Sequence, residues 1–262
     1  MLKALNIHAR IGKKQILRGI DLTAHSGEVT AIVGPNGSGK STLLKAITDE
    51  INFTGSVSLN GQDISGLKPW ELAALRGVLP QASTLAFPFT VIEVVRMGLM
   101  SGTSGERADI PDRALAAVGL DGYAMRFYQE LSGGEQQRVQ LARVLCQVWN
   151  PVVESAPRWL LLDEPVASLD IGHQLLVMQL IRDYATRGGG VVAVMHDLNL
   201  SAMFADRMAI VLDGKLLLSG PPDRVMQNDV LSKAYGCDLT VNMPAAAGQS
   251  YVLPHLASMQ SE

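Results

Sequence analysis

The sequence predicts an α/β domain in which helices flank a mainly parallel β-sheet. Three mainly apolar runs, residues 28–33, 159–162 and 191–195, have the length of buried strands, and helical patterns lie between them. Continuous apolar strands that alternate with helices are typical of a parallel sheet covered on both faces. Strand-like patterns at the start of the chain and a helical stretch in its middle indicate two additions to this core.

The first addition is a small antiparallel β subdomain at the N-terminus. Residues 1–28 contain short strand-like patterns, with Gly12 and Gly27 at the expected turns. The next expected elements are a strand at 28–33, a helix at 40–49, and strands at 55–59 and 77–79.

The second addition is a helical subdomain inserted into the α/β core. Helical patterns dominate at 90–100, 112–120 and 134–149. Downstream we expect strands at 159–162, 191–195 and 208–212, a helix at 173–187, and a short helix with a small hairpin after 221. The expected organisation is a single domain that spans 1–262. Its core and β subdomain are expected at about 1–82 and 158–220, and its helical subdomain at about 83–157. A C-terminal extension is expected at about 221–262.

Composition excludes several classes of protein. Hydrophobic residues make up 47% of the chain and charged residues 18%, which is enough apolar material for a packed core. The net charge of −3 argues against non-specific binding to nucleic acid, which needs a basic face. Cys146 and Cys237 lack the spacing of metal ligands and are expected to be free thiols in a reducing cytosol. The chain shows no secretion signal and no apolar run of membrane-spanning length, so we expect a soluble protein whose role at a membrane depends on a partner.

A glycine-rich motif predicts a phosphate-binding loop. Residues 34–41 read GPNGSGKS, which matches the pattern G-x-x-x-x-G-K-[ST] between an expected strand and an expected helix. The glycines let backbone N–H groups point at phosphate oxygens, and the helix N-terminus favours the same anion. Lys40 is expected to reach the β- and γ-phosphates of ATP or GTP, and the Ser41 hydroxyl to ligate Mg²⁺. The expected nucleotide-binding residues here are Gly34, Pro35, Asn36, Gly37, Ser38, Gly39, Lys40, Ser41 and Thr42.

A second acidic motif completes the expected site. The segment WLLLDEP, residues 159–165, places Asp163 at the carboxyl end of a buried strand, where nucleotide sites form in such sheets. Asp163 is expected to hold Mg²⁺ through water, and Glu164 to polarise a water in line with the γ-phosphate. Taken alone, an apolar strand followed by two acids is equally consistent with an ordinary strand end.

A further motif narrows the class of nucleotide-binding protein. Residues 131–136 read LSGGEQ, which resembles the signature motif of the ABC ATPase family. The other family motifs occur in order, with Gln81 as the Q-loop glutamine, 168–170 as the D-loop and His196 as the switch histidine. The resemblance covers essentially the whole chain.

The resemblance implies a sandwich of two identical subunits around two ATP molecules. Ser132, Gly133 and Gly134 are expected at a helix N-terminus, where they form a second anion cradle for the partner's γ-phosphate. Glu135 and Asp170 are included with these nucleotide-contacting residues. Within one chain the expected catalytic residues are Glu164 as base, His196 as the positioning group and Gln81, which is also an expected ligand of Mg²⁺.

One position departs from the family pattern. Family members usually stack an aromatic ring on adenine near the end of the first strand, but this chain has Ile11 there, and the nearest ring is His8. The sequence therefore leaves the preference for ATP over GTP open.

The expected membrane partner is a separate permease dimer. Residues 83–97 follow Gln81, and their apolar Phe87-Pro88-Phe89 segment is interpreted as part of a groove for a permease helix, with ordinary core packing as the alternative. The segments LAFPFTVIEVVRMG, LDIGHQ and HDLNL resemble importers of ferric siderophores, haem and vitamin B12. The long connection 147–159 is most similar to the haem importers among them, and its Trp149 and Trp159 can equally be packing residues.

This resemblance implies an ATP-driven subunit that binds peripherally at the cytoplasmic face of the inner membrane and does not bind nucleic acid. A periplasmic haem-binding protein is expected to act on it indirectly. Vitamin B12 or a ferric siderophore remains open as the cargo. A more remote alternative is an ABC ATPase that acts on nucleic acid or ribosomes, although such proteins typically have tandem domains or a coiled-coil insertion, and this chain shows neither.

Overall fold

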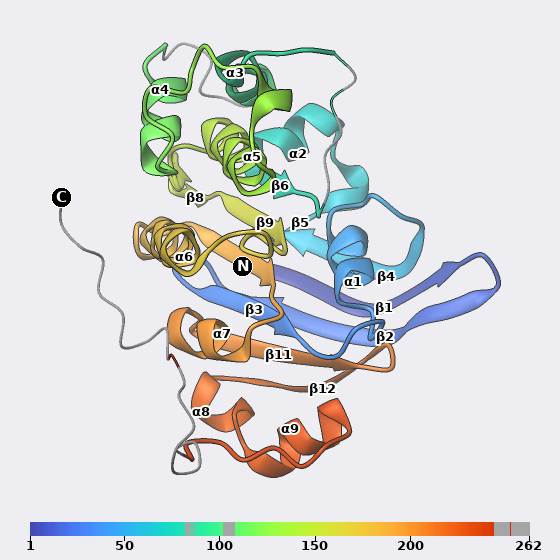
Figure 1. Ribbon diagram of the computed structural model, residues 1–262. Helices are drawn as coiled ribbons and strands as arrows, with labels where there is room; N and C mark the ends of the chain where they lie inside the picture. The colour runs from blue at the N-terminus through green and yellow to red at the C-terminus, as the bar shows by residue number, and fades with distance from the viewer. Residues whose placement is uncertain (82–84, 86, 102–107, 244–251, 253–262) are drawn as a thin grey trace.

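A computed structural model describes residues 1–81, 85, 87–101, 108–243 and 252. Its centre is a six-stranded sheet in the order β12-β11-β3-β10-β9-β6 (Figure 1). All neighbouring strands in it are parallel except β12, which pairs with β11 in antiparallel fashion. These strands are β12 (Lys215–Gly220), β11 (Arg207–Leu212), β3 (Val29–Val33), β10 (Gly190–Val194), β9 (Trp159–Asp163) and β6 (Arg76–Leu79). The predicted α/β class is confirmed.

The central sheet separates two apolar cores, which explains its continuous apolar strands. Within β9, Leu160 and Leu162 face one core while Leu161 faces the other, and all three side chains are fully buried. A strand buried on both faces cannot place polar side chains on either side without loss of hydration. The same alternation occurs in β10.

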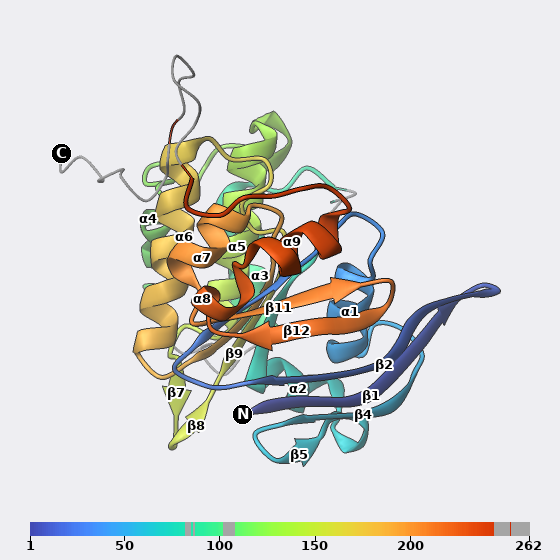
Figure 2. The ribbon, with the colours of Figure 1, turned by 90° about the horizontal axis from the view of Figure 1, so that it is seen from below.

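The N-terminal addition is the expected antiparallel sheet, in the order β2-β1-β4-β5. It packs with α1 on one face of the central sheet, as Figure 2 shows from below. Its elements are β1 (Leu2–Ile11), β2 (Lys14–Ala24), β4 (Phe53–Leu59) and β5 (Gln62–Asp63), and α1 spans Lys40–Ile47. This arrangement holds the start of α1 between the two sheets.

Short helical elements between β5 and β6 pack on the same face as the N-terminal sheet and α1, namely the 3₁₀ turn Ile64–Gly66 and α2 (Pro69–Leu75), whose buried side chains Ile64 and Leu72 lie in the core of that sheet. Longer helices cover the other face. The middle of the chain contributes α3 (Val91–Ser101), α4 (Ile110–Ala117) and α5 (Gly133–Gln147), with a 3₁₀ turn at Tyr128–Glu130. Further along are α6 (Ile171–Thr186), α7 (Leu198–Phe204), α8 (Pro222–Val225) and α9 (Asn228–Tyr235). In Figure 1, α3, α4 and α5 form a lobe beyond the β6 edge, whereas α8 and α9 lie at the opposite edge beside β12. No helix in the described part of the chain is long and apolar enough to cross a membrane.

The long connection before β9 forms a small hairpin, β7 (Val152–Val153) paired with β8 (Ala156–Pro157). Asn60 anchors it, because its Nδ2 donates to the Pro157 carbonyl at 2.8 Å and its Oδ1 accepts from Trp159 Nε1 at 3.0 Å. Trp159 is fully buried, and Trp149 lies against the larger core with the Arg113 guanidinium 5.2 Å from its ring. Both tryptophans therefore act as packing residues of the protein interior.

The C-terminal extension differs in part from the expectation. Residues 221–243 contain α8 and α9 but no strand, so the expected terminal hairpin is not found there. Most of the Pro/Ala/Gly stretch lies outside the described residues.

Candidate active site

The phosphate loop connects β3 to α1 and has the backbone of an anion cradle. Gly34, Gly37 and Gly39 have φ values of 142°, 75° and 109°, a region that glycine adopts without strain. A Cβ at Gly34 would lie 2.2 Å from the Val211 carbonyl oxygen, so only glycine fits there. The first turn of α1 has no acidic residue and no side-chain cap, which leaves its N–H groups available to an anion.

Side chains of the loop also fit a phosphate group. Lys40 is 5% exposed, and its Nζ donates to the carbonyls of Gly34 at 2.8 Å and Pro35 at 3.1 Å. Burial lowers the pKa of Lys40, while the nearby carboxylates of Asp163 and Glu164 oppose that shift. The buried Ser38 hydroxyl has no hydrogen-bond partner among the described residues. A buried donor without a partner is unfavourable, and a phosphate oxygen is a suitable acceptor for it.

Asp163 and Ser41 form an oxygen pair beside this loop. Asp163 ends β9, is 3% exposed, and accepts a hydrogen bond from Ser41 Oγ at 3.0 Å. Burial raises the pKa of Asp163, with a further rise from Glu164, while the Ser41 hydrogen bond opposes both. A carboxylate and a hydroxyl suit Mg²⁺, which commonly takes few protein ligands and completes its shell with phosphate and water. The described residues contain no cluster of three or more His, Cys, Asp or Glu that could hold a metal alone.

Three predicted catalytic residues meet at one carboxylate oxygen. Oε1 of Glu164 accepts a hydrogen bond from Gln81 Nε2 at 3.1 Å and lies 2.6 Å from His196 Nε2. Gln81, Glu164 and His196 follow the carboxyl ends of β6, β9 and β10, which are neighbours in the sheet. The side chain of Glu164 is 14% exposed and that of His196 is 43% exposed. The carboxylate is thus shielded on one side by the protein and reached from solvent past the histidine.

The backbone of Glu164 is held in an unusual conformation. Its φ is 54°, in the left-handed region that non-glycine residues rarely adopt. Its N–H donates to the Val194 carbonyl at 3.1 Å. Such strain persists only where the surroundings hold the residue, and it is frequent at functional sites.

The signature motif forms a separate polar surface at the start of α5. Ser132 caps the helix, since its Oγ accepts from Glu135 N at 3.3 Å while Glu135 Oε2 accepts from Ser132 N at 2.8 Å and from Ser132 Oγ at 2.7 Å. These bonds from the Ser132 hydroxyl and N–H lower the pKa of Glu135. The reciprocal pair is a capping box, and it fixes Gly133 and Gly134 in the first helical turn.

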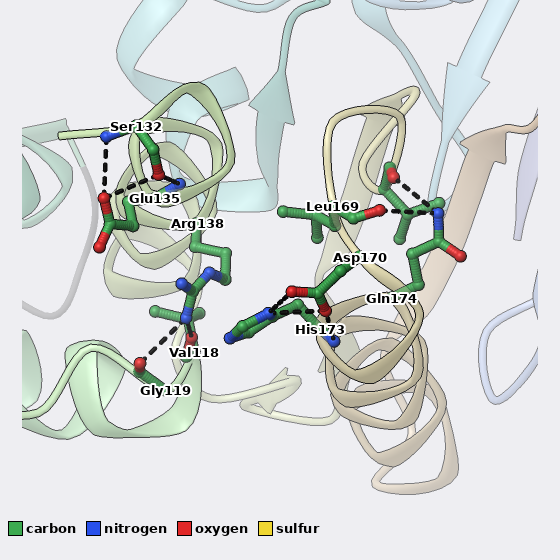
Figure 3. Close-up of polar contacts among 10 residues, drawn as sticks. Val118, Gly119, Ser132, Glu135, Arg138, Leu169, Asp170, His173 and Gln174 are labelled. Atoms are coloured by element: carbon green, nitrogen blue, oxygen red, sulfur yellow. Dashed lines mark hydrogen bonds and ion pairs between the residues drawn. The ribbon is translucent and has the colours of Figure 1, made fainter. Parts of the chain in front are cut away.

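The D-loop forms the opposite wall of this surface (Figure 3). Asp170 caps α6, accepting from His173 N at 2.9 Å, and its carboxylate lies 2.8 Å from His173 Nδ1. These contacts lower the pKa of Asp170. A hollow of about 490 Å³ lies between the walls, lined by Ser132, Gly133, Gly134, Glu135, Arg138, Ser168, Leu169, Asp170 and His173. None of these residues belongs to the phosphate loop, so one chain carries two distinct polar sites.

The expected adenine position has no aromatic side chain. Ile11 ends β1, is 58% exposed and pairs with Lys14. His8 lies further back along β1, where its Nε2 is 3.0 Å from Asn6 Oδ1.

One residue that was not predicted from the sequence contacts the segment of the predicted base Glu164. Gln137 of α5 donates from Nε2 to the Glu164 carbonyl at 2.6 Å, and its Oε1 accepts from Ser168 N at 3.3 Å. The sequence feature that could have indicated Gln137 is its spacing, because residue 137 lies one helical turn after Gly133 and Gly134 and therefore on the same face of the helix.

Comparisons with known proteins agree with this geometry. A family model described as "ABC transporter" matches residues 17–167. The hemin import ATP-binding protein HmuV of Jannaschia sp. is 60% identical, with 98% of this chain and 95% of that protein covered. The protein of the same name from Roseobacter denitrificans is 62% identical, with 98% of each covered.

Solved structures show the same fold. An ATP-binding subunit of an ABC transporter superposes with a TM-score of 0.76 at 21% identity, covering 90% of this chain and 98% of that one. A dimeric post-hydrolysis ATP-binding cassette, MJ0796 bound to ADP and Pi, superposes with a TM-score of 0.73 at 28% identity, covering 85% of this chain and 99% of that one. With its phosphate loop, signature helix and D-loop arranged on this fold, the chain belongs to the ABC transporter family.

Proposed function

We propose that this chain is the ATP-hydrolysing subunit of an ABC importer, and that it works as a homodimer to drive haem uptake through a membrane permease. The observation that carries the catalytic part is the convergence of Gln81 and His196 on Oε1 of Glu164. A carboxylate held by two side chains beside a phosphate loop has the geometry of a general base for an attacking water.

The proposed roles follow from the contacts. Lys40 and the loop N–H groups bind the β- and γ-phosphates, where the ammonium exchanges its carbonyl partners for phosphate oxygens. Ser41 and Asp163, with Gln81 as a further ligand, would hold Mg²⁺, which would supply positive charge to the phosphate oxygens. The Glu164 carboxylate takes the proton from the attacking water, and His196 holds the carboxylate and the γ-phosphate in register.

The proposed homodimer is supported by the two separate polar sites of one chain. The signature surface, from Ser132 to Glu135, has a capped helix N-terminus suited to an anion but contains no phosphate-loop residue. Two copies related by a two-fold axis would place each signature surface over the partner's bound ATP. The dimeric cassette at 28% identity supports this arrangement.

A permease is proposed to dock beside Gln81. Phe87 is 69% exposed, Met125 78% and Phe127 47%, which is unusual for large apolar side chains. The Phe87 and Phe89 rings meet edge to face with centroids 6.4 Å apart, and the Phe89 carbonyl accepts from Tyr128 N. The patch is therefore a fixed surface on the helical lobe, suited to an apolar helix from a partner. Residues 82–84 and 86 lie outside the described residues.

Haem as cargo is supported by the relatives of 60% and 62% identity that are named hemin import ATP-binding proteins. The cargo does not need to touch this chain. We place the chain peripherally at the cytoplasmic face of the inner membrane, where a periplasmic haem-binding protein acts on it only through the permease.

The catalytic proposal is tested with Glu164→Gln in the purified chain. ATP binding, followed by equilibrium titration with a fluorescent analogue, should remain within about twofold of wild type, while kcat falls by about 10² to 10⁴. Glu154→Gln, in the turn between β7 and β8, is the matched control and should leave kcat unchanged. Wild-type turnover in Glu164→Gln would refute the base assignment.

The cargo proposal is tested with the chain assembled with its permease in lipid. Binding proteins loaded with haem, vitamin B12 or a ferric siderophore are added in turn, and ATP hydrolysis is measured. Stimulation by the haem-loaded protein alone supports the proposal, and stimulation only by another cargo replaces haem.

A further inference from the structure

Two glutamines hold the segment between the catalytic carboxylate and α6. Gln137 of α5 spans the Glu164 carbonyl at 2.6 Å and Ser168 N at 3.3 Å. From the other side, Gln174 of α6 donates from Nε2 to the carbonyls of Leu169 at 3.0 Å and Val166 at 3.4 Å (Figure 3). The D-loop is thus held by amide side chains of both helices that flank it.

The signature helix also touches this segment directly. A Cβ at Gly134 would lie 2.9 Å from the Ser168 carbonyl oxygen, so the two backbones are in close approach. Gly134 belongs to the proposed cradle for the partner's ATP, and Gln137 follows it by about one helical turn. The signature surface, which contacts the partner's ATP in the proposed dimer, is therefore linked through the Gln137 side chain to Glu164, which acts on the ATP bound by its own chain.

We propose that Gln137 is a positioning residue that couples the signature surface of a chain to the catalytic carboxylate of the same chain. The inference rests on the proposed sandwich dimer. When the partner's ATP engages Ser132 and Gly134, α5 is held in place, and Gln137 then holds Glu164 with its carboxylate on His196 and Gln81. Hydrolysis at one site thereby depends on occupancy of the other.

The strained backbone of Glu164 is the reason that this contact matters. Its φ of 54° is unfavourable for a residue with a side chain, so the carboxylate keeps its orientation only while the peptide groups on both sides of Glu164 are held by hydrogen bonds. On the N–H side the Val194 carbonyl accepts at 3.1 Å. On the carbonyl side the contacts are Gln137 at 2.6 Å and the weaker Ala167 N–H at 3.3 Å. Without Gln137 the carbonyl side loses its shorter contact.

The test compares two substitutions on the same helix in the purified full chain. Gln137→Met keeps the side-chain volume and removes both hydrogen bonds to the D-loop segment. Gln147→Met is the matched control, because Gln147 Nε2 also donates two bonds from α5, at 2.8 Å to the Ala73 and Arg76 carbonyls, but to a different neighbour. A third variant, Gln137→Glu, keeps an oxygen for Ser168 N–H and places an oxygen against the Glu164 carbonyl.

We expect kcat for ATP to fall by about tenfold or more in Gln137→Met and Gln137→Glu, with KM within about twofold of wild type. The Hill coefficient of hydrolysis should fall towards 1 in both variants, since occupancy of one site no longer aligns the other. ATP-induced dimerisation, measured by gel filtration in a Glu164→Gln background, should persist. Gln147→Met should keep both kcat and the Hill coefficient.

Three results would overturn the inference. They are a wild-type kcat in Gln137→Met, an equal loss of kcat in Gln147→Met, and a loss of kcat matched by an equal loss of ATP affinity. If Gln137→Met does not fold, as judged by its melting curve, Gln137→Glu decides by the same criteria. A wild-type chain that neither hydrolyses ATP nor dimerises with it would instead refute the proposed function, and this inference with it.

Discussion

Gly98 is the point of closest approach between two helices of the helical lobe, and we predict that Gly98→Ala destabilises the fold. A Cβ at Gly98 of α3 would lie 2.0 Å from the Arg143 carbonyl oxygen of α5 and 3.0 Å from Cys146 Cβ. The first of these neighbours is backbone, so no side-chain rotation can relieve the contact. The two helices must move apart.

The size of the effect follows from that geometry. Real Cβ atoms essentially never approach another heavy atom within 3.0 Å, so the contact must lengthen from 2.0 Å to at least 3.0 Å, a shift of 1.0 Å. Val91, Val94 and Val95 on α3 are fully buried, and a gap of that size forfeits a quarter to a half of each of their dispersion contacts. Overpacking of this kind costs about 1–3 kcal/mol, and against a backbone atom we expect about 3 kcal/mol. For a chain of this size that lowers Tm by about 6–12 °C.

The assay is thermal and urea unfolding of the purified chain, with Gly66→Ala as the control. Gly66 has no atom within 4 Å of an added Cβ and no left-handed φ, so its substitution should leave Tm within about 1 °C. A Tm for Gly98→Ala equal to that of wild type would refute the claim that α3 and α5 are in backbone contact. The proposed docking patch and the signature surface both lie on this lobe. Permease-stimulated ATP hydrolysis by Gly98→Ala should therefore fall together with its Tm.

Three further predictions concern single side chains. Burial raises the pKa of the Cys146 thiol to about 12, whereas Cys237 is exposed, so a thiol reagent at pH 8 should label Cys237 alone until the protein is unfolded, as mass spectrometry can check. The hydrogen bonds from Ser132 lower the pKa of Glu135 below its ordinary value of 4.5. Its contribution to stability is therefore present above pH 4.5 and is lost as the pH falls through the lowered pKa. The difference in urea unfolding between wild type and Glu135→Gln should be full at pH 6 and should shrink as the pH is lowered further below 4.5. Ile11→Tyr should restore a stacking surface and tighten ATP binding by about tenfold, measured by titration, and unchanged affinity would show that the base does not lie against β1.

The α/β core could be predicted because its strands lie between two apolar cores. Residues 159–162 and 191–195 are apolar at every position, and in the structure they form β9 and β10 with both faces covered. The hairpin β7–β8 could not be predicted in the same way, since its pairing depends on Asn60, which is distant in sequence, and on Glu154 and Ser155 with φ values of 49° and 64°. A contact with a residue so distant in sequence leaves no pattern in the local sequence of the hairpin.

The helical part of the C-terminal extension was expected in outline only. The sequence predicts one short helix after 221, whereas the structure has two, α8 and α9, whose residues Val225, Leu231 and Ala234 are buried against the larger core. Short helices of this kind are stabilised by packing and not by their own propensity.

The proposed catalytic motifs can be located from the sequence because each is contiguous and lies at a strand end or a helix start. Parallel strands bring their carboxyl ends to one edge of the sheet, so the sequence alone places Gln81, Glu164 and His196 near one another. Gln137 belongs to a different category. Its position on the face of Gly134 is periodic, but its reach to the Glu164 carbonyl depends on how α5 packs against β6 and the other helices of the lobe. The contact that links the two proposed ATP sites is therefore a property of the tertiary fold, and substitutions at the α3–α5 crossing should act on it without touching a motif.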